Sequence, residues 1–147
     1  MTYYVSTQVA LPFEEAVEIT KNALKEKGFG VLTEIDVKGT LHSKLGVDFA
    51  PYRILGACNP RMAHKALMAE PLIGTMLPCN VIVREVEGGR VEVSAVDPVA
   101  SMQAVDNPAL AETAEQVREA MREVVDRVGA VSEAGLAAIC TEQRLAD

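Results

Sequence analysis

The stretch CNVIVREVEGGRVEVSAV, residues 79–96, decides the fold class of this 147-residue chain. Aliphatic residues recur at alternate positions on both sides of Gly88-Gly89, which is the pattern of two half-buried strands. A Gly-Gly pair between such runs favours a tight turn, because glycine accepts a positive φ at no steric cost. The sequence therefore predicts an antiparallel pair of strands over 79–87 and 90–96.

Outward from this hairpin, periodicity and capping signals place the remaining elements. The predicted elements are strands over 3–9, 30–36 and 51–57 and helices over 12–27, 36–44 and 60–70. The helix over 60–70 has the clearest start, with Asn59 as N-cap and Pro60 in the first turn. We expect an α+β fold: a mainly antiparallel sheet of about five strands with helices packed on one face.

The longest predicted helix begins after Asn107-Pro108. Its apolar residues form one narrow stripe: Leu110, Ala114, Val117, Met121, Val124 and Val128. Such a stripe packs either on the sheet of its own chain or against a second copy in a dimer. One stripe can be buried in only one of these contacts, and we favour packing on the sheet. A single domain is predicted over 1–129. Residues 130–147 are predicted to be a C-terminal extension with a short helix, capped by Ser132 and burying Cys140.

Charge and cysteine content restrict the class of protein. The net charge of −7 opposes binding to nucleic acid or to an anionic membrane surface, because both require a basic footprint. No window approaches the roughly 18 apolar residues of a transmembrane helix, and the first residues lack the pattern of a signal peptide. The three cysteines then indicate reduced thiols and a cytoplasmic location.

Several motifs, in order along the chain, resemble a known family. They are Gly28-Phe29-Gly30-Val31-Leu32, Ile54-Leu55-Gly56-Ala57-Cys58-Asn59-Pro60, Leu77-Pro78-Cys79-Asn80-Val81 and Asp97-Pro98. Together they make residues 3–129 resemble the domain-of-unknown-function family 302. The resemblance implies a compact α+β domain related to the TATA-box-binding-protein-like fold, and it implies homodimers. It implies no activity, because none is established for that family.

Cys58 and Cys79 are the main candidate functional residues. Cys58 follows a predicted strand and precedes a helix N-terminus, whose free N–H groups and dipole stabilise a thiolate. Cys79 begins the next strand, so the two thiols meet at one sheet edge if these strands are antiparallel neighbours. They then form a reactive dithiol, two ligands of a metal ion, or small buried side chains at a structural corner.

His64 is the imidazole nearest to these cysteines in the sequence. Cys58, Cys79 and His64 are therefore candidate metal ligands, although the spacing is not a zinc signature. The sequence carries no nucleotide-binding loop, and a metal ion is the one cofactor that the candidate residues suggest.

Two amides and one carboxylate complete the candidate site. Asn59 is expected to cap its helix and Asn80 to satisfy backbone groups at a strand start. Alternatively, both amides contact a ligand. Glu70, on the apolar side of its helix, is either a candidate catalytic acid or base or a solvated end residue.

Three functions remain open at this point. We favour a non-catalytic homodimeric domain that binds a small molecule or a metal ion at the Cys58–Cys79 edge. The candidate ligand contacts are Cys58, Asn59, His64, Cys79 and Asn80. The second possibility is a thiol-dependent enzyme or redox sensor, with Cys58 as the thiolate and Cys79 as the resolving thiol. The third is a structural or interaction module whose cysteines fill the core.

Overall fold

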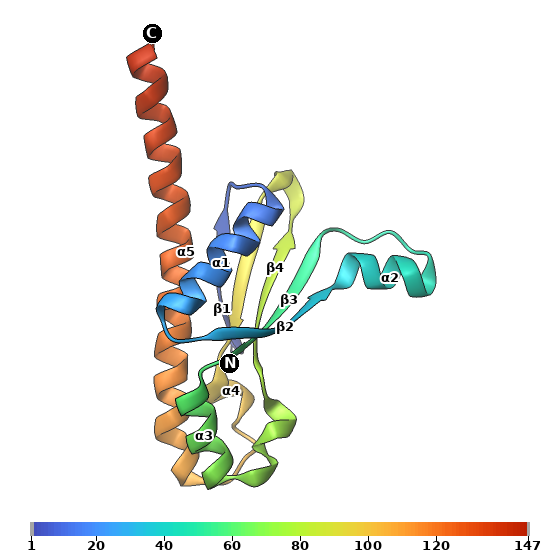
Figure 1. Ribbon diagram of the computed structural model, residues 1–147, viewed down its shortest axis with the longest axis vertical. Coiled ribbons are helices and arrows are strands. Elements are labelled where there is room, and N and C mark those ends of the chain that lie inside the picture. The colour runs from blue at the N-terminus through green and yellow to red at the C-terminus, as the bar shows by residue number, and fades with distance from the viewer. Residues whose placement is uncertain (1, 147) are drawn as a thin grey trace.

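The computed structural model describes the backbone of residues 2–146 and the side chains of residues 2–131 (Figure 1). Its strands are β1 (Tyr4–Val9), β2 (Gly30–Asp36), β3 (Tyr52–Cys58), β4 (Cys79–Glu85) and β5 (Val91–Val96). Its helices are α1 (Phe13–Glu26), α2 (Val37–Leu45), α3 (Pro60–Ala69), α4 (Pro98–Ser101) and α5 (Ala111–Ala146). Short 3-10 helices are η1 (Pro71–Met76), η2 (Glu87–Gly89) and η3 (Pro108–Leu110). The strands and helices predicted over residues 3–96 are all present, with ends shifted by no more than two residues.

The strands form one five-stranded antiparallel sheet in the order β1-β5-β4-β3-β2. This confirms the predicted α+β class with a mainly antiparallel sheet. Gly88 and Gly89 have φ values of 78° and 72°, as the predicted turn between β4 and β5 requires. β2 is irregular at one point, where the register shifts between Val31 and Thr33.

The helices α1 and α5 cover one face of this sheet (Figure 1). Alternate strand residues, including Leu55, Val81 and Val93, point toward them and are fully buried. All six residues of the predicted apolar stripe are buried, and four of them lie in this same interior: Val117, Met121, Val124 and Val128. The stripe is therefore a helix-on-sheet contact. The dimer-seam alternative is wrong, because these side chains are already buried within one chain.

A second layer of α3, η1, α4 and η3, which we call the cap, lies at one end of the sheet (Figure 1). Its own small apolar cluster consists of Ala66, Ile73 and Leu110. Asn107 ties the layer together: its amide nitrogen donates to the carbonyl of Ala69 at 2.9 Å. The cap thus has packing that is separate from the main core.

Residues 37–51, which we call the arm, join β2 to β3 and project from the body of the molecule (Figure 1). Asp36 is the N-cap residue of α2, because one of its carboxylate oxygens accepts the Gly39 N–H at 3.0 Å. No residue of α2 is buried. The arm is thus a helical segment without a core of its own.

The C-terminal helix α5 continues without a break from Ala111 to Ala146. The prediction of a separate short helix capped by Ser132 is therefore wrong; this segment has no proline, and serine costs little inside a helix. The predicted burial of Cys140 concerns a side chain outside the described residues. Among the helices of the described residues, none combines the length and the apolarity needed to cross a membrane.

Candidate functional site

The end of β3 and the start of β4 bring the two candidate cysteines to one sheet edge. Ala57 pairs with Cys79 in antiparallel register, and Cys58 is the next residue along β3. The predicted antiparallel pairing of these two strands is therefore confirmed. It places both thiols beside the cap.

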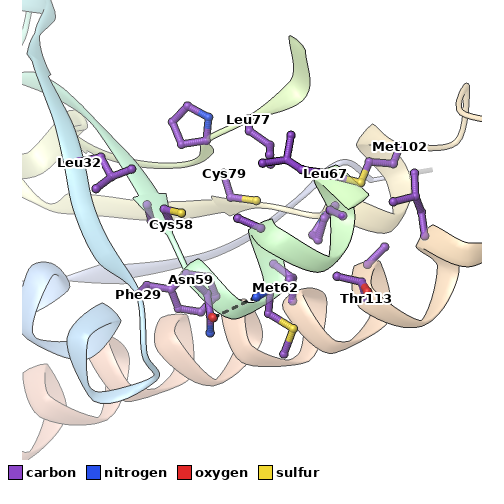
Figure 2. Close-up of a pocket in the computed structure, with 18 residues that line it drawn as sticks. Phe29, Leu32, Cys58, Asn59, Met62, Leu67, Leu77, Cys79, Met102 and Thr113 are labelled. Carbon is purple, nitrogen blue, oxygen red and sulfur yellow. Dashed lines mark hydrogen bonds between the residues drawn. The ribbon is translucent and has the colours of Figure 1, made fainter. Parts of the chain in front are cut away.

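Between this edge and the cap lies a cavity of about 290 Å³, which we call the thiol pocket (Figure 2). Its apolar wall includes Phe29, Leu32, Ala57, Met62, Ala63, Ala66, Leu67, Leu77, Pro78, Met102, Leu110, Ala114 and Val117. The side chains with a polar atom are those of Cys58, Asn59, Cys79 and Thr113. A cavity with so few polar partners holds water poorly and suits an apolar ligand.

Asn59 shapes one corner of the thiol pocket. Its Oδ1 accepts the backbone N–H of Met62 at 3.3 Å, as Figure 2 shows, so the predicted N-cap is confirmed. Its Nδ2 faces Gly28, where a Cβ would lie only 3.3 Å away. Gly28 follows the C-cap residue of α1 and has a φ of 83°, a conformation that glycine adopts without strain. The backbone therefore engages the oxygen of Asn59, and this residue positions the start of α3.

Both thiols of the pocket are free and partly buried. Burial raises the pKa of the Cys79 thiol to about 11, and the neighbouring Cys58 adds to the rise. Cys79 is thus a neutral thiol at physiological pH, whereas thiol exchange requires a thiolate. This environment opposes the role of Cys79 as a resolving thiol.

The predicted metal ligands do not come together. His64 lies on the exposed side of α3 and does not line the thiol pocket. Within the part of the chain that the structure describes, no group of three or more His, Cys, Asp or Glu side chains is placed to hold a metal ion. Of the three predicted metal ligands, Cys58 and Cys79 line the pocket together.

Asn80 and Glu70 also lie away from the thiols. Asn80 is exposed and lines a hollow on the other face of the sheet, because successive strand residues point to opposite sides. Glu70 follows the last residue of α3, and its Oε2 accepts the amide of Asn107 at 3.3 Å. In the structure, Glu70 thus forms a hydrogen bond within the cap and does not line the thiol pocket.

The sequence did not identify the far wall of the thiol pocket. Met102, Leu110 and Thr113 come from segments about fifty residues away from Cys58 in the chain. Only the apolar face of α3, with Met62 and Ala66, gave a signal, because helical spacing marked it as packed against something. Which segment would oppose it was not visible in any local pattern.

Comparison with known proteins agrees with this geometry. A family model described as "Domain of unknown function DUF302" matches residues 5–128. The chain belongs to the DUF302 family. A crystal structure of an uncharacterized conserved DUF302 protein from Bacillus stearothermophilus is similar, with a TM-score of 0.81 and 31% sequence identity. The similarity covers 87% of this chain and 99% of that one.

No curated protein matches this DUF302 chain. The resemblance read from the motifs is confirmed by the family match. Family membership fixes the fold and carries no activity, so function has to be argued from the site.

Proposed function

We propose that this DUF302 chain is a non-catalytic domain of the reducing cytoplasm that binds a small, mainly apolar molecule in the thiol pocket. The observation that carries the proposal is the wall of the pocket, which is apolar apart from two thiols, one hydroxyl and one amide. Well-formed apolar pockets with a few convergent polar groups are the usual sites for small ligands.

The pocket also limits the size and polarity of the ligand. Its volume of about 290 Å³ lies at the small end of ligand sites, which span roughly 300–1,000 Å³. Asn59 already uses its oxygen in capping, which leaves the thiols and Thr113 as the polar contacts. A ligand with an apolar body and at most one weakly polar group fits these constraints.

The alternative functions have less support. A redox or thiol-transfer role needs a reactive pair, and the raised pKa of Cys79 disfavours its thiolate. A metal role lacks a third protein ligand among the side chains that the structure describes, because His64 is on the outside of α3. A purely structural role leaves the open cavity between the two apolar clusters unexplained.

A homologous series of n-alkanols, from butanol to dodecanol, tests the proposal. Binding is measured by calorimetry and by the rise in the unfolding temperature. Each added methylene contributes about 0.8 kcal/mol when buried, so affinity should rise about fourfold per methylene and then level off when the pocket is full. Affinity that climbs with chain length without a break would indicate adsorption to the surface and contradict the proposal.

Two variants of α3 provide the matched controls. Ala63→Leu adds bulk to the wall of the thiol pocket, whereas Lys65→Leu adds the same side chain on the exposed side of the same helix. We expect Ala63→Leu to lose alkanol binding and Lys65→Leu to retain it, with both unliganded variants folded by circular dichroism. Equal binding by the two variants would exclude the thiol pocket as the site.

A further inference from the structure

Sulfur atoms are concentrated around the thiol pocket. The chain has three cysteines and six methionines, and four of these nine side chains line this one cavity: Cys58, Cys79, Met62 and Met102. Figure 2 shows the two cysteines on the side of the strands and the two methionines on the side of the cap. Sulfur is more polarizable than the carbon of an aliphatic wall, and it makes favourable contacts with the edges of aromatic rings. The wall therefore offers such contacts from two sides.

Phe29 adds an aromatic ring to the same wall. Its backbone N–H donates to the Leu24 carbonyl at 2.9 Å, just after the turn at Gly28, and only 3% of the residue is exposed. The ring is thus held in place before any ligand arrives. Aromatic rings attract one another in offset or edge-to-face arrangements, beyond what their buried area alone contributes. A ligand ring next to Phe29 would gain this attraction, and a saturated ligand would not.

The polar groups of the wall are weak, uncharged donors. Among the described residues that line the cavity, none is charged. Thr113 has a neutral hydroxyl, and burial raises the pKa of the Cys79 thiol to about 11, so that thiol keeps its hydrogen at physiological pH. The face of an aromatic ring carries the negative end of its quadrupole and accepts a weak donor of this kind. An anionic or cationic ligand, by contrast, would find no counter-charge in the described wall.

We propose that the ligand of the thiol pocket is a small, uncharged aromatic molecule of one or two rings, and that the sulfur atoms of the wall recognise its ring. The inference rests on the proposed function, because it names the class of molecule that the same cavity binds. The cavity of about 290 Å³ is about twice the size of a dry apolar cavity of roughly 150 Å³ that binds benzene, so two fused rings can fit. The sulfur contacts, the Phe29 ring and the weak donors all favour a ring over an aliphatic body of the same size.

A matched pair of ligands tests the preference for a ring. Naphthylmethanol and its fully hydrogenated counterpart share one carbon skeleton and one hydroxyl group. The hydrophobic effect alone favours the hydrogenated compound, because it is the more apolar of the two. We expect naphthylmethanol to bind the full chain at least about tenfold more tightly, measured by calorimetry with a reductant that keeps both thiols reduced.

Substitutions of methionine by leucine test the role of the sulfur atoms. The double variant Met62→Leu with Met102→Leu removes two sulfur atoms from the wall with little change in side-chain volume. Met68→Leu is the matched control, because Met68 also belongs to α3 but is 73% exposed and does not line the cavity. In the double variant the preference for naphthylmethanol should fall at least about threefold, while affinity for the hydrogenated compound stays within about twofold of the wild type. The control should change neither affinity.

The possible results separate this inference from the proposed function. If the hydrogenated compound binds the wild type as tightly as naphthylmethanol does, the inference is wrong, and this comparison requires no variant to fold. A double variant that is folded by circular dichroism and keeps the full preference also overturns the inference. In both cases the thiol pocket remains a site for apolar molecules. If neither compound nor any alkanol binds, the proposed function fails and this inference fails with it.

Discussion

Cys79 makes the stability of the folded chain depend on alkaline pH. Its thiol pKa rises from 9.0 to about 11, first because it is buried and second because Cys58 lies close. As the pH passes 9, the unfolded chain releases this proton while the folded chain retains it, so the free energy of unfolding falls. The contribution that is present below pH 9 and lost by about pH 11 amounts to about 2–3 kcal/mol.

We therefore predict that Cys79→Ala loses stability less steeply between pH 9 and pH 11 than the wild type does, although it is less stable at neutral pH. Denaturant unfolding at a series of pH values measures the difference. Cys58→Ala is the control, and it should keep most of the steep loss, because burial is the larger cause of the shift at Cys79. Identical pH profiles for the wild type and Cys79→Ala would contradict the prediction.

Gly56 is required by its close neighbours. A Cβ at this position would collide with the hydroxyl of Thr33 and lie 2.8 Å from Cγ of Pro78. We predict that Gly56→Ala lowers the free energy of unfolding by about 1–3 kcal/mol, since overpacking forces the neighbours to move. Gly74→Ala is the matched control, because its nearest contact, Leu67 Cδ2 at 3.9 Å, is ordinary. A chemical denaturation curve that shifts equally for both variants would exclude the steric explanation.

The two Cys-Asn dipeptides show what residue types alone could predict. Asn59 follows the last residue of a strand and precedes a proline, and these local signals are enough to identify it as a helix cap. Asn80 lies at the entrance of a strand, one residue after Cys79, and strand alternation sends it to the opposite face. The face of the sheet on which the Asn80 side chain lies depends on how β4 pairs with β3. The sequence predicted that pairing only as a possibility.

At the scale of elements, Asn107 holds the cap closed. Its Nδ2 donates to the Ala69 carbonyl at 2.9 Å and to Glu70 at 3.3 Å, while its Oδ1 accepts the Ala109 N–H at 3.0 Å. We predict that Asn107→Ala lowers the unfolding free energy by about 1–2 kcal/mol, because it removes a helix cap and leaves a carbonyl unpaired.

Glu70→Gln is the informative comparison for that prediction. The amide oxygen of glutamine still accepts from Asn107, so the expected loss in unfolding free energy is below about 0.5 kcal/mol and alkanol binding should be unchanged. If Glu70→Gln abolished ligand binding, the Glu70 carboxylate would instead have a functional role.

Elements were predictable where their signals are local, and their packing was not. Asn59 marked a helix start, and the glycine pair marked the hairpin, because capping and turn chemistry act within a few residues. Met102 and Thr113 lie beside the sheet edge only because the cap and α5 are oriented so that they face it. The periodicity of a single segment does not determine this orientation.

At the scale of the molecule, the thiol pocket separates two apolar clusters, the main core and the cap. A ligand there would contact both Ala57 of the sheet and Met102 of the cap. Binding of the proposed ligand would therefore stabilise the contact between the layers, and its effect on unfolding would follow from ligand concentration relative to the dissociation constant. This makes thermal unfolding a suitable measure of occupancy.

The domain boundary near residue 129 remains a prediction, and the packing of α5 shows how to test it. Val128 is fully buried, and Gly129 lies so close to β1 that a Cβ there would be 2.9 Å from Oγ1 of Thr7. A chain that ends at Val131 keeps these contacts. We predict an unfolding free energy within about 0.5 kcal/mol of the full chain and the same alkanol affinity.

A shorter chain that ends at Glu123 gives the contrasting case. It loses the buried side chains of Val124, Val125 and Val128, each of which contributes about 1.5–3 kcal/mol, so it should lose most of its stability or fail to fold. The free energy that separates the two truncations measures how much of α5 belongs to the cooperative unit. If the chain ending at Val131 is itself destabilised by more than about 2 kcal/mol, the segment after 129 belongs to the domain and the predicted boundary is wrong.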